Sequence, residues 1–69
     1  MQGTNVRLWA PAKPGLPAES GGEWYVPPGD ETRIAYSKRV LAETQAEEPH
    51  RGWRLETRGS ERGWHPWQD

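Results

Sequence analysis

The chain contains no cysteine and no phenylalanine among its 69 residues. Without cysteine it can form neither disulfides nor thiolate metal sites, and we expect a protein of a reducing compartment, the cytoplasm. No run of apolar residues approaches the length of a membrane span, and residues 1–5 lack the basic and apolar stretches of a signal peptide. We therefore expect no membrane partner.

Large aliphatic side chains are scarce, and this feature by itself is typical of a disordered chain. A formal net charge of -1, however, removes the self-repulsion that disordered chains usually carry. The chain instead has five tryptophans, and about three or four buried rings, at roughly 200 Å² each, would stabilise a small fold. Residues 1–69 are therefore predicted to form a single small domain. Its large aliphatic residues are Val6, Leu8, Leu16, Val26, Ile34, Val40, Leu41 and Leu55.

Two short strands are predicted in the first half of the chain. Residues 6–9 alternate apolar and polar side chains, which is typical of a half-buried strand. Residues 23–26 form a second candidate, stopped by Pro27 and Pro28. The Pro- and Gly-rich residues 10–22 between them support neither a helix nor a central strand, so we expect a long, mobile loop there.

One helix is predicted, from Asp30 to about Glu47. Asp30 is a suitable N-cap, and Pro49 ends the helix. At 100° per residue, one arc of this helix collects the side chains that should face the core. These are Ile34, Ser37, Val40, Leu41 and Thr44. Arg39 and Glu43 lie on the opposite, exposed side.

The last part of the chain predicts a β-hairpin about Gly59-Ser60, a dipeptide suited to a two-residue turn. In that register Arg58 opposes Glu61, Leu55 opposes Trp64, and Trp53 opposes Pro66. The face toward the helix would then carry Trp53, Leu55, Trp64 and Pro66. The other face would carry Arg54, Glu56, His65 and Trp67.

Together these elements predict an α+β fold of order β-β-α-β-β. A small antiparallel sheet, made of the two N-terminal strands and the C-terminal hairpin, is packed by one α-helix. The strand order within the sheet is left open.

The sequence contains no signature of catalysis, a metal or a cofactor, so we expect a protein that is not an enzyme. His50 and His65 have no second ligand at helical or strand spacing, which argues against a metal site. Ser20, Ser37 and Ser60 fall in a loop, on a helix face and in a turn, without a positioned base.

Binding to another protein explains the composition best, because Trp and Arg dominate interface hot spots. In the predicted register Trp67 projects away from the core with Arg54 and His65 beside it, and Trp9 extends the patch. These four residues are the predicted partner-binding residues. The same sequence also allows Trp67, near the end of the chain, to fold back onto the domain.

Nucleic-acid binding is the alternative. Arg51, Arg54, Arg58 and Arg62 interleave with tryptophans in the C-terminal hairpin, and this mixture can contact phosphates and stack on bases. Glu56 and Glu61 dilute the patch, and the chain as a whole is slightly acidic.

Arg outnumbers Lys, and Ala, Gly, Pro and Trp are plentiful, which is typical of a GC-rich genome. In size, composition and lack of motifs the chain resembles the short accessory proteins of phages that infect GC-rich bacteria. That resemblance implies a phage-encoded effector that binds and inhibits a host protein in the host cytoplasm. The predicted function is therefore a non-catalytic protein-binding module.

Overall fold

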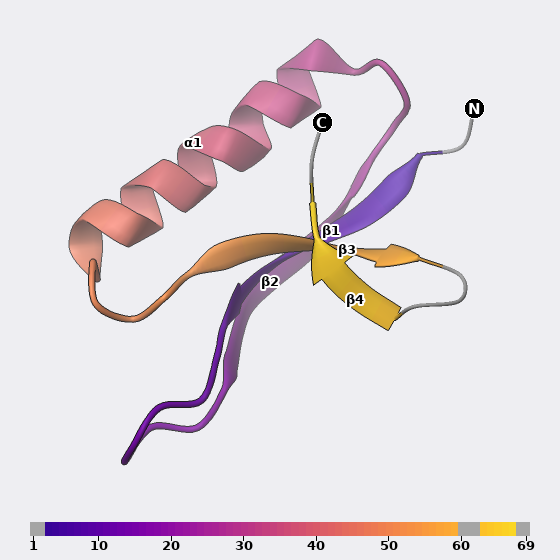
Figure 1. The fold of residues 1–69 in the computed structure, drawn as a ribbon. Coiled ribbons are helices and arrows are strands. Elements are labelled where there is room, and N and C mark those ends of the chain that lie inside the picture. Colours follow the sequence, from indigo (N-terminus) through magenta and orange to yellow (C-terminus); the bar gives the residue numbers. More distant parts are fainter. Residues whose placement is uncertain (1–2, 60–62, 68–69) are drawn as a thin grey trace.

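The chain folds as two strands, one helix and two further strands, the order that the sequence predicts (Figure 1). This computed structural model describes residues 3–59 and 63–67. The elements are β1 (Thr4–Ala10), β2 (Glu19–Val26), α1 (Glu31–Glu47), β3 (Arg54–Gly59) and β4 (Gly63–Pro66). The strands form one antiparallel sheet and α1 packs on it, so the α+β class is confirmed. Within the described residues, no helix is long and apolar enough to cross a membrane.

The sheet has the strand order β2-β1-β3-β4, so β1 lies between β2 and β3. Alternate side chains of a strand point to opposite faces of the sheet, so the side chains of β1 are divided between two faces. One face, which we call the helix face, packs against α1; the other is the open face. The register places on the open face Asn5, Arg7 and Trp9 of β1, Glu23 and Tyr25 of β2, Arg54, Glu56 and Arg58 of β3, and Trp64 and Pro66 of β4.

The core lies on the helix face and is small. Half-buried side chains from α1 and two further tryptophans, Trp24 and Trp67, pack around its buried centre. Each large ring therefore covers apolar surface that the few aliphatic side chains cannot cover by themselves. The buried centre consists of Val6, Leu8, Ala10, Val26, Trp53 and Leu55.

Helix α1 begins where the sequence predicts. The Asp30 side chain accepts a hydrogen bond from the Arg33 amide at 2.9 Å, as an N-cap residue should. The predicted arc faces the sheet: Ser37 is fully buried, and Ile34 and Leu41 are half-buried. The opposite side of the helix is exposed, as predicted.

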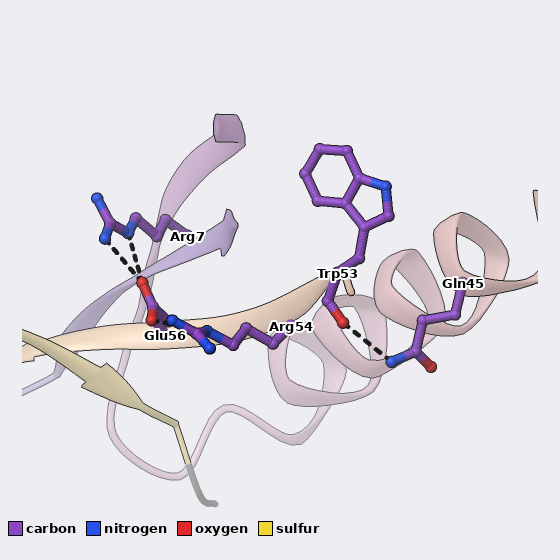
Figure 2. A network of polar contacts seen from close by, with 5 residues as sticks. All are labelled: Arg7, Gln45, Trp53, Arg54 and Glu56. Atoms are coloured by element: carbon purple, nitrogen blue, oxygen red, sulfur yellow. Dashed lines mark hydrogen bonds and ion pairs between the residues drawn. The ribbon is translucent and has the colours of Figure 1, made fainter. Parts of the chain in front are cut away.

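Polar contacts add to this weakly apolar interface between helix and sheet. The Trp24 indole Nε1 donates to Ser37 Oγ at 2.7 Å, and Ser37 Oγ donates to the Arg33 carbonyl at 2.9 Å. At the other end of α1, Gln45 Nε2 donates to the Trp53 carbonyl at 3.1 Å (Figure 2). The helix is thus tied to both β2 and the start of β3.

The prediction that residues 10–22 contain no strand is wrong, because β1 runs to Ala10 and β2 begins at Glu19. Gly21 allows close packing here, because a Cβ on it would lie 2.8 Å from Leu8 Cδ2 and 3.2 Å from Trp53 Cζ3. Residues 11–18, which we call the arm, extend the β1–β2 hairpin beyond the sheet (Figure 1). Its tip is a tight turn in which Lys13 and Leu16 exchange two backbone hydrogen bonds around Pro14-Gly15.

The predicted register of the C-terminal hairpin is also wrong. The observed pairs are Arg58 with Trp64, Thr57 with His65, and Glu56 with Pro66. Relative to the predicted pairs, β4 is shifted by three residues, because residues 60–62 separate the strands where a two-residue turn was expected. The predicted partner Glu61 and the turn residue Ser60 lie outside the described residues. A shift by an odd number exchanges the two faces of a strand, so Trp64 lies on the open face and His65 on the helix face.

Arg51, in the connection between α1 and β3, holds the base of the arm. Its side chain donates from Nη1 to the Pro11 carbonyl and from Nη2 to the Pro17 carbonyl at 2.6 Å. Arg51 is only 8% exposed, and its Nε lies 3.8 Å from the Glu19 carboxylate. One buried cation therefore joins both sides of the arm to the body of the domain.

We expect Arg51→Met to loosen the arm, because the variant keeps an apolar stem but loses both bonds to the proline carbonyls. Hydrogen exchange should become at least about 10-fold faster at the Lys13 and Leu16 amides. The free energy of unfolding should fall by about 2 kcal/mol. Arg39→Met, on the exposed side of α1, is the matched control. Equal exchange rates in the two variants would show that Arg51 does not hold the arm.

Candidate protein-binding surface

The open face carries a stack of three side chains at its centre. The Arg7 guanidinium carbon lies 3.9 Å from the centroid of the Trp9 ring and 4.2 Å from that of the Trp64 ring. Trp9 comes from β1 and Trp64 from β4, so the stack reaches across β3. Cation–π contacts of this kind orient a guanidinium group between two rings.

Glu56 of β3 fixes the Arg7 guanidinium in this position. Its Oε1 accepts from Arg7 Nε at 2.9 Å and from Arg7 Nη2 at 2.7 Å, and its Oε2 accepts from Arg54 Nε at 2.9 Å (Figure 2). Glu56 is 3% exposed, so its charge is neutralised within the network. Both carboxylate oxygens are engaged, which suits a structural anchor.

The open face brings together two of the four predicted partner-binding residues. Trp9 and Arg54 are register neighbours on β1 and β3. His65 and Trp67 are not with them, because the register turns His65 to the helix face and Trp67 packs against the core there. Their predicted exposure beside Arg54 is therefore wrong.

Trp67 packs against the core beside Leu55, whose carbonyl accepts its amide at 3.1 Å. The ring also lines an open hollow of about 140 Å³ together with Val26, Pro27 and Ile34. The possibility that Trp67 folds back onto the domain is the one that the structure bears out. The apolar gain of packing the ring against the core favours that position over solvent.

The arginines predicted for nucleic-acid contacts are divided between different parts of the molecule. Arg54 and Arg58 lie on the open face, two residues either side of Glu56. Arg51 is buried in its contacts with the arm, and Arg62 lies outside the described residues. The described part of the hairpin therefore does not present one continuous set of arginines.

Two residues of the open face were missed by the sequence analysis, Arg7 and Trp64, whereas Glu56 was placed on the same face as Arg54 but without its role as an anchor. The alternation in residues 6–9 already puts Arg7 on the same face as Trp9, and that signal could have found it. Trp64 was missed because its face depends on the hairpin register. Among the described residues, no group of three His, Asp or Glu side chains is close enough to hold a metal ion.

Comparisons with protein-family models, with curated proteins and with solved structures found no match to this chain. The side chains of the open face are therefore the basis on which a function can be proposed.

The Glu56 network should contribute measurably to stability. Glu56→Gln keeps the shape of the side chain but leaves Arg7 and Arg54 without their anion, so we expect a loss of about 2 kcal/mol in the free energy of unfolding. Urea denaturation followed by tryptophan fluorescence measures this loss. Glu43→Gln on the exposed side of α1 should change stability by no more than about 0.5 kcal/mol. Equal stability of the two variants would contradict the anchoring role.

Trp67→Ala should destabilise the domain by about 2–3 kcal/mol, since a half-buried ring leaves the core. The control is Leu16→Ala at the tip of the arm, where the side chain is 51% exposed. Thermal melts followed by circular dichroism should separate the two variants clearly. Indistinguishable melting temperatures would mean that the Trp67 ring does not support the core.

Proposed function

We propose that this chain is a non-catalytic protein-binding module and that the open face of its sheet is the contact surface. The observation that carries the proposal is the Trp9–Arg7–Trp64 stack on a sheet face that α1 does not cover. Trp and Arg are the residues that most often dominate protein interfaces. The stack is also rigid, since Glu56 fixes Arg7, and a rigid surface loses little conformational entropy on binding.

The composition of the rest of the open face supports the same function. Tyr25 at its β2 end is 53% exposed, the largest exposed fraction among the exposed large hydrophobic residues. Arg54 keeps a half-exposed side chain at the β3 end. The core lies on the other face, so neither tryptophan of the stack is needed to fill it.

Single-stranded nucleic acid is the second candidate, favoured by the position of Arg54 and Arg58 beside tryptophan rings. One observation favours a protein partner instead: each tryptophan of the stack already gives ring surface to Arg7, which leaves less of it to stack on bases. Binding to phosphates would weaken steeply with salt, whereas contacts centred on the rings would change little.

The more specific function predicted from composition, a phage-encoded effector that inhibits a host protein in the cytoplasm, stays a prediction. The open face offers such an effector a surface with which to cover part of its target. Inhibition would then follow wherever that part of the target is an active or assembly surface.

Selection of binders tests the proposal without knowledge of the natural partner. Peptides and small domains are selected from a random display library against the immobilised chain, and each binder is mapped by shifts of the backbone amide resonances. Binders should perturb the four strands that carry the open face, β2 included, and Tyr25→Ala on β2 should weaken them about 10-fold. Tyr36→Ala is the matched control, because Tyr36 is 42% exposed on α1. Failure to obtain any binder that maps to the open face would overturn the proposal.

A further inference from the structure

The open face contains two similar pairs of side chains, one at each end of β3. Trp9 lies opposite Arg54, and Trp64 lies opposite Arg58. Arg54 and Arg58 are four residues apart on one strand, so they point to the same face about 13 Å from each other. Each cation thus has an indole ring from a neighbouring strand beside it.

The centre between these pairs presents no free charge. Glu56 lies between the two arginines on β3, but it is 3% exposed and bound to Arg7. Along β3 the two ends of the open face therefore remain cationic while the middle is neutral; the exposed Glu23 carboxylate lies on β2, on the other side of Arg7. A ligand that fits this pattern carries two anionic groups with an uncharged part between them.

Both terminal cations are available to such a ligand. Arg54 uses only its Nε on Glu56, and its side chain is 51% exposed. Arg58 is exposed and forms no hydrogen bond or ion pair with another residue that the structure describes. A carboxylate can therefore approach either guanidinium group without displacing an existing partner.

We propose that the partner binds through an extended acidic segment with two carboxylates four residues apart, one for Arg54 and one for Arg58. This inference rests on the proposed function and names its partner class. An extended chain has the same two-residue repeat as β3, so its residues i and i+4 span the same distance of about 13 Å. Residue i+2 of the partner faces the Arg7–Glu56 pair and is uncharged.

The pattern distinguishes a peptide from a single-stranded nucleic acid. A nucleic acid carries a charge on every nucleotide, so a strand that reached both arginines would also bring phosphate over the centre that Glu56 occupies. A peptide can carry its charges at chosen positions only. The alternation of cationic, neutral and cationic surface along β3 therefore favours a peptide.

Synthetic peptides test the spacing directly. The first has two glutamates four residues apart with threonine and valine between and around them; the second has the glutamates three apart; the third has glutamine in their place. A thymidine oligonucleotide is the fourth probe. Affinities are measured by fluorescence anisotropy with the full chain, and the contacted residues by shifts of the backbone amide resonances.

The first peptide should bind about 5-fold more tightly than the second and third and should shift amides of β3 and β4. Arg58→Gln should remove this preference, and it should not weaken the glutamine peptide further. Arg39→Gln, which makes the same change of charge on the exposed side of α1, should leave all affinities unchanged. Equal melting temperatures of the two variants confirm that both are folded.

The remaining outcomes separate the two proposals. If peptides bind the open face regardless of glutamate spacing, the acidic pattern is overturned and the binding function stands. If the oligonucleotide binds there more tightly than any peptide, the acidic segment is overturned in favour of nucleic acid. If neither these probes nor the selected binders perturb the open face, the proposed function fails and the inference fails with it.

Discussion

The ion pair between Arg7 and Glu56 connects the central strand of this sheet to its neighbour on the face that α1 leaves open. Arg7 makes two hydrogen bonds to one carboxylate oxygen and lies between the Trp9 and Trp64 rings. Three of the four strands therefore meet around one guanidinium group. Because a buried or half-buried charge is costly without a partner, the position of each of these side chains depends on the others. The candidate surface is rigid for this reason.

The five tryptophans divide between the two faces of the sheet according to the register. Trp24, Trp53 and Trp67 belong to the helix face, where they cover a core with few aliphatic residues. Trp9 and Trp64 belong to the open face. Indole rings thus have two roles in this chain. Three of them complete a small core, and two of them hold the Arg7 guanidinium on a surface suited to binding.

Hydrogen bonds of polar side chains join the helix, the strands and the arm of this small domain. Ser37 joins α1 to Trp24 on β2, and Gln45 joins the end of α1 to the start of β3. Arg51 joins the arm to the α1–β3 connection. Ser37 and Arg51 make hydrogen bonds between segments distant in sequence, so the fold depends on contacts of a kind that local propensity does not encode.

The sequence by itself determined the elements whose signals are local. The Asp30 cap, the arc through Ile34 and Leu41 and the alternation in residues 6–9 predict α1 and β1, because capping and side-chain periodicity act within a few residues. The sequence analysis put Trp9 in one patch with Arg54, but their pairing follows from β1 lying next to β3, which the sequence left open. The tertiary structure alone decided the strand order, the extension of β1 and β2 toward the arm, and the register of β4. In the hairpin, the three-residue shift of β4 exchanges the faces of Trp64 and Trp67. The observed register places Trp64 against Arg7 of β1, a contact with a distant part of the chain that the residues of the hairpin do not encode by themselves.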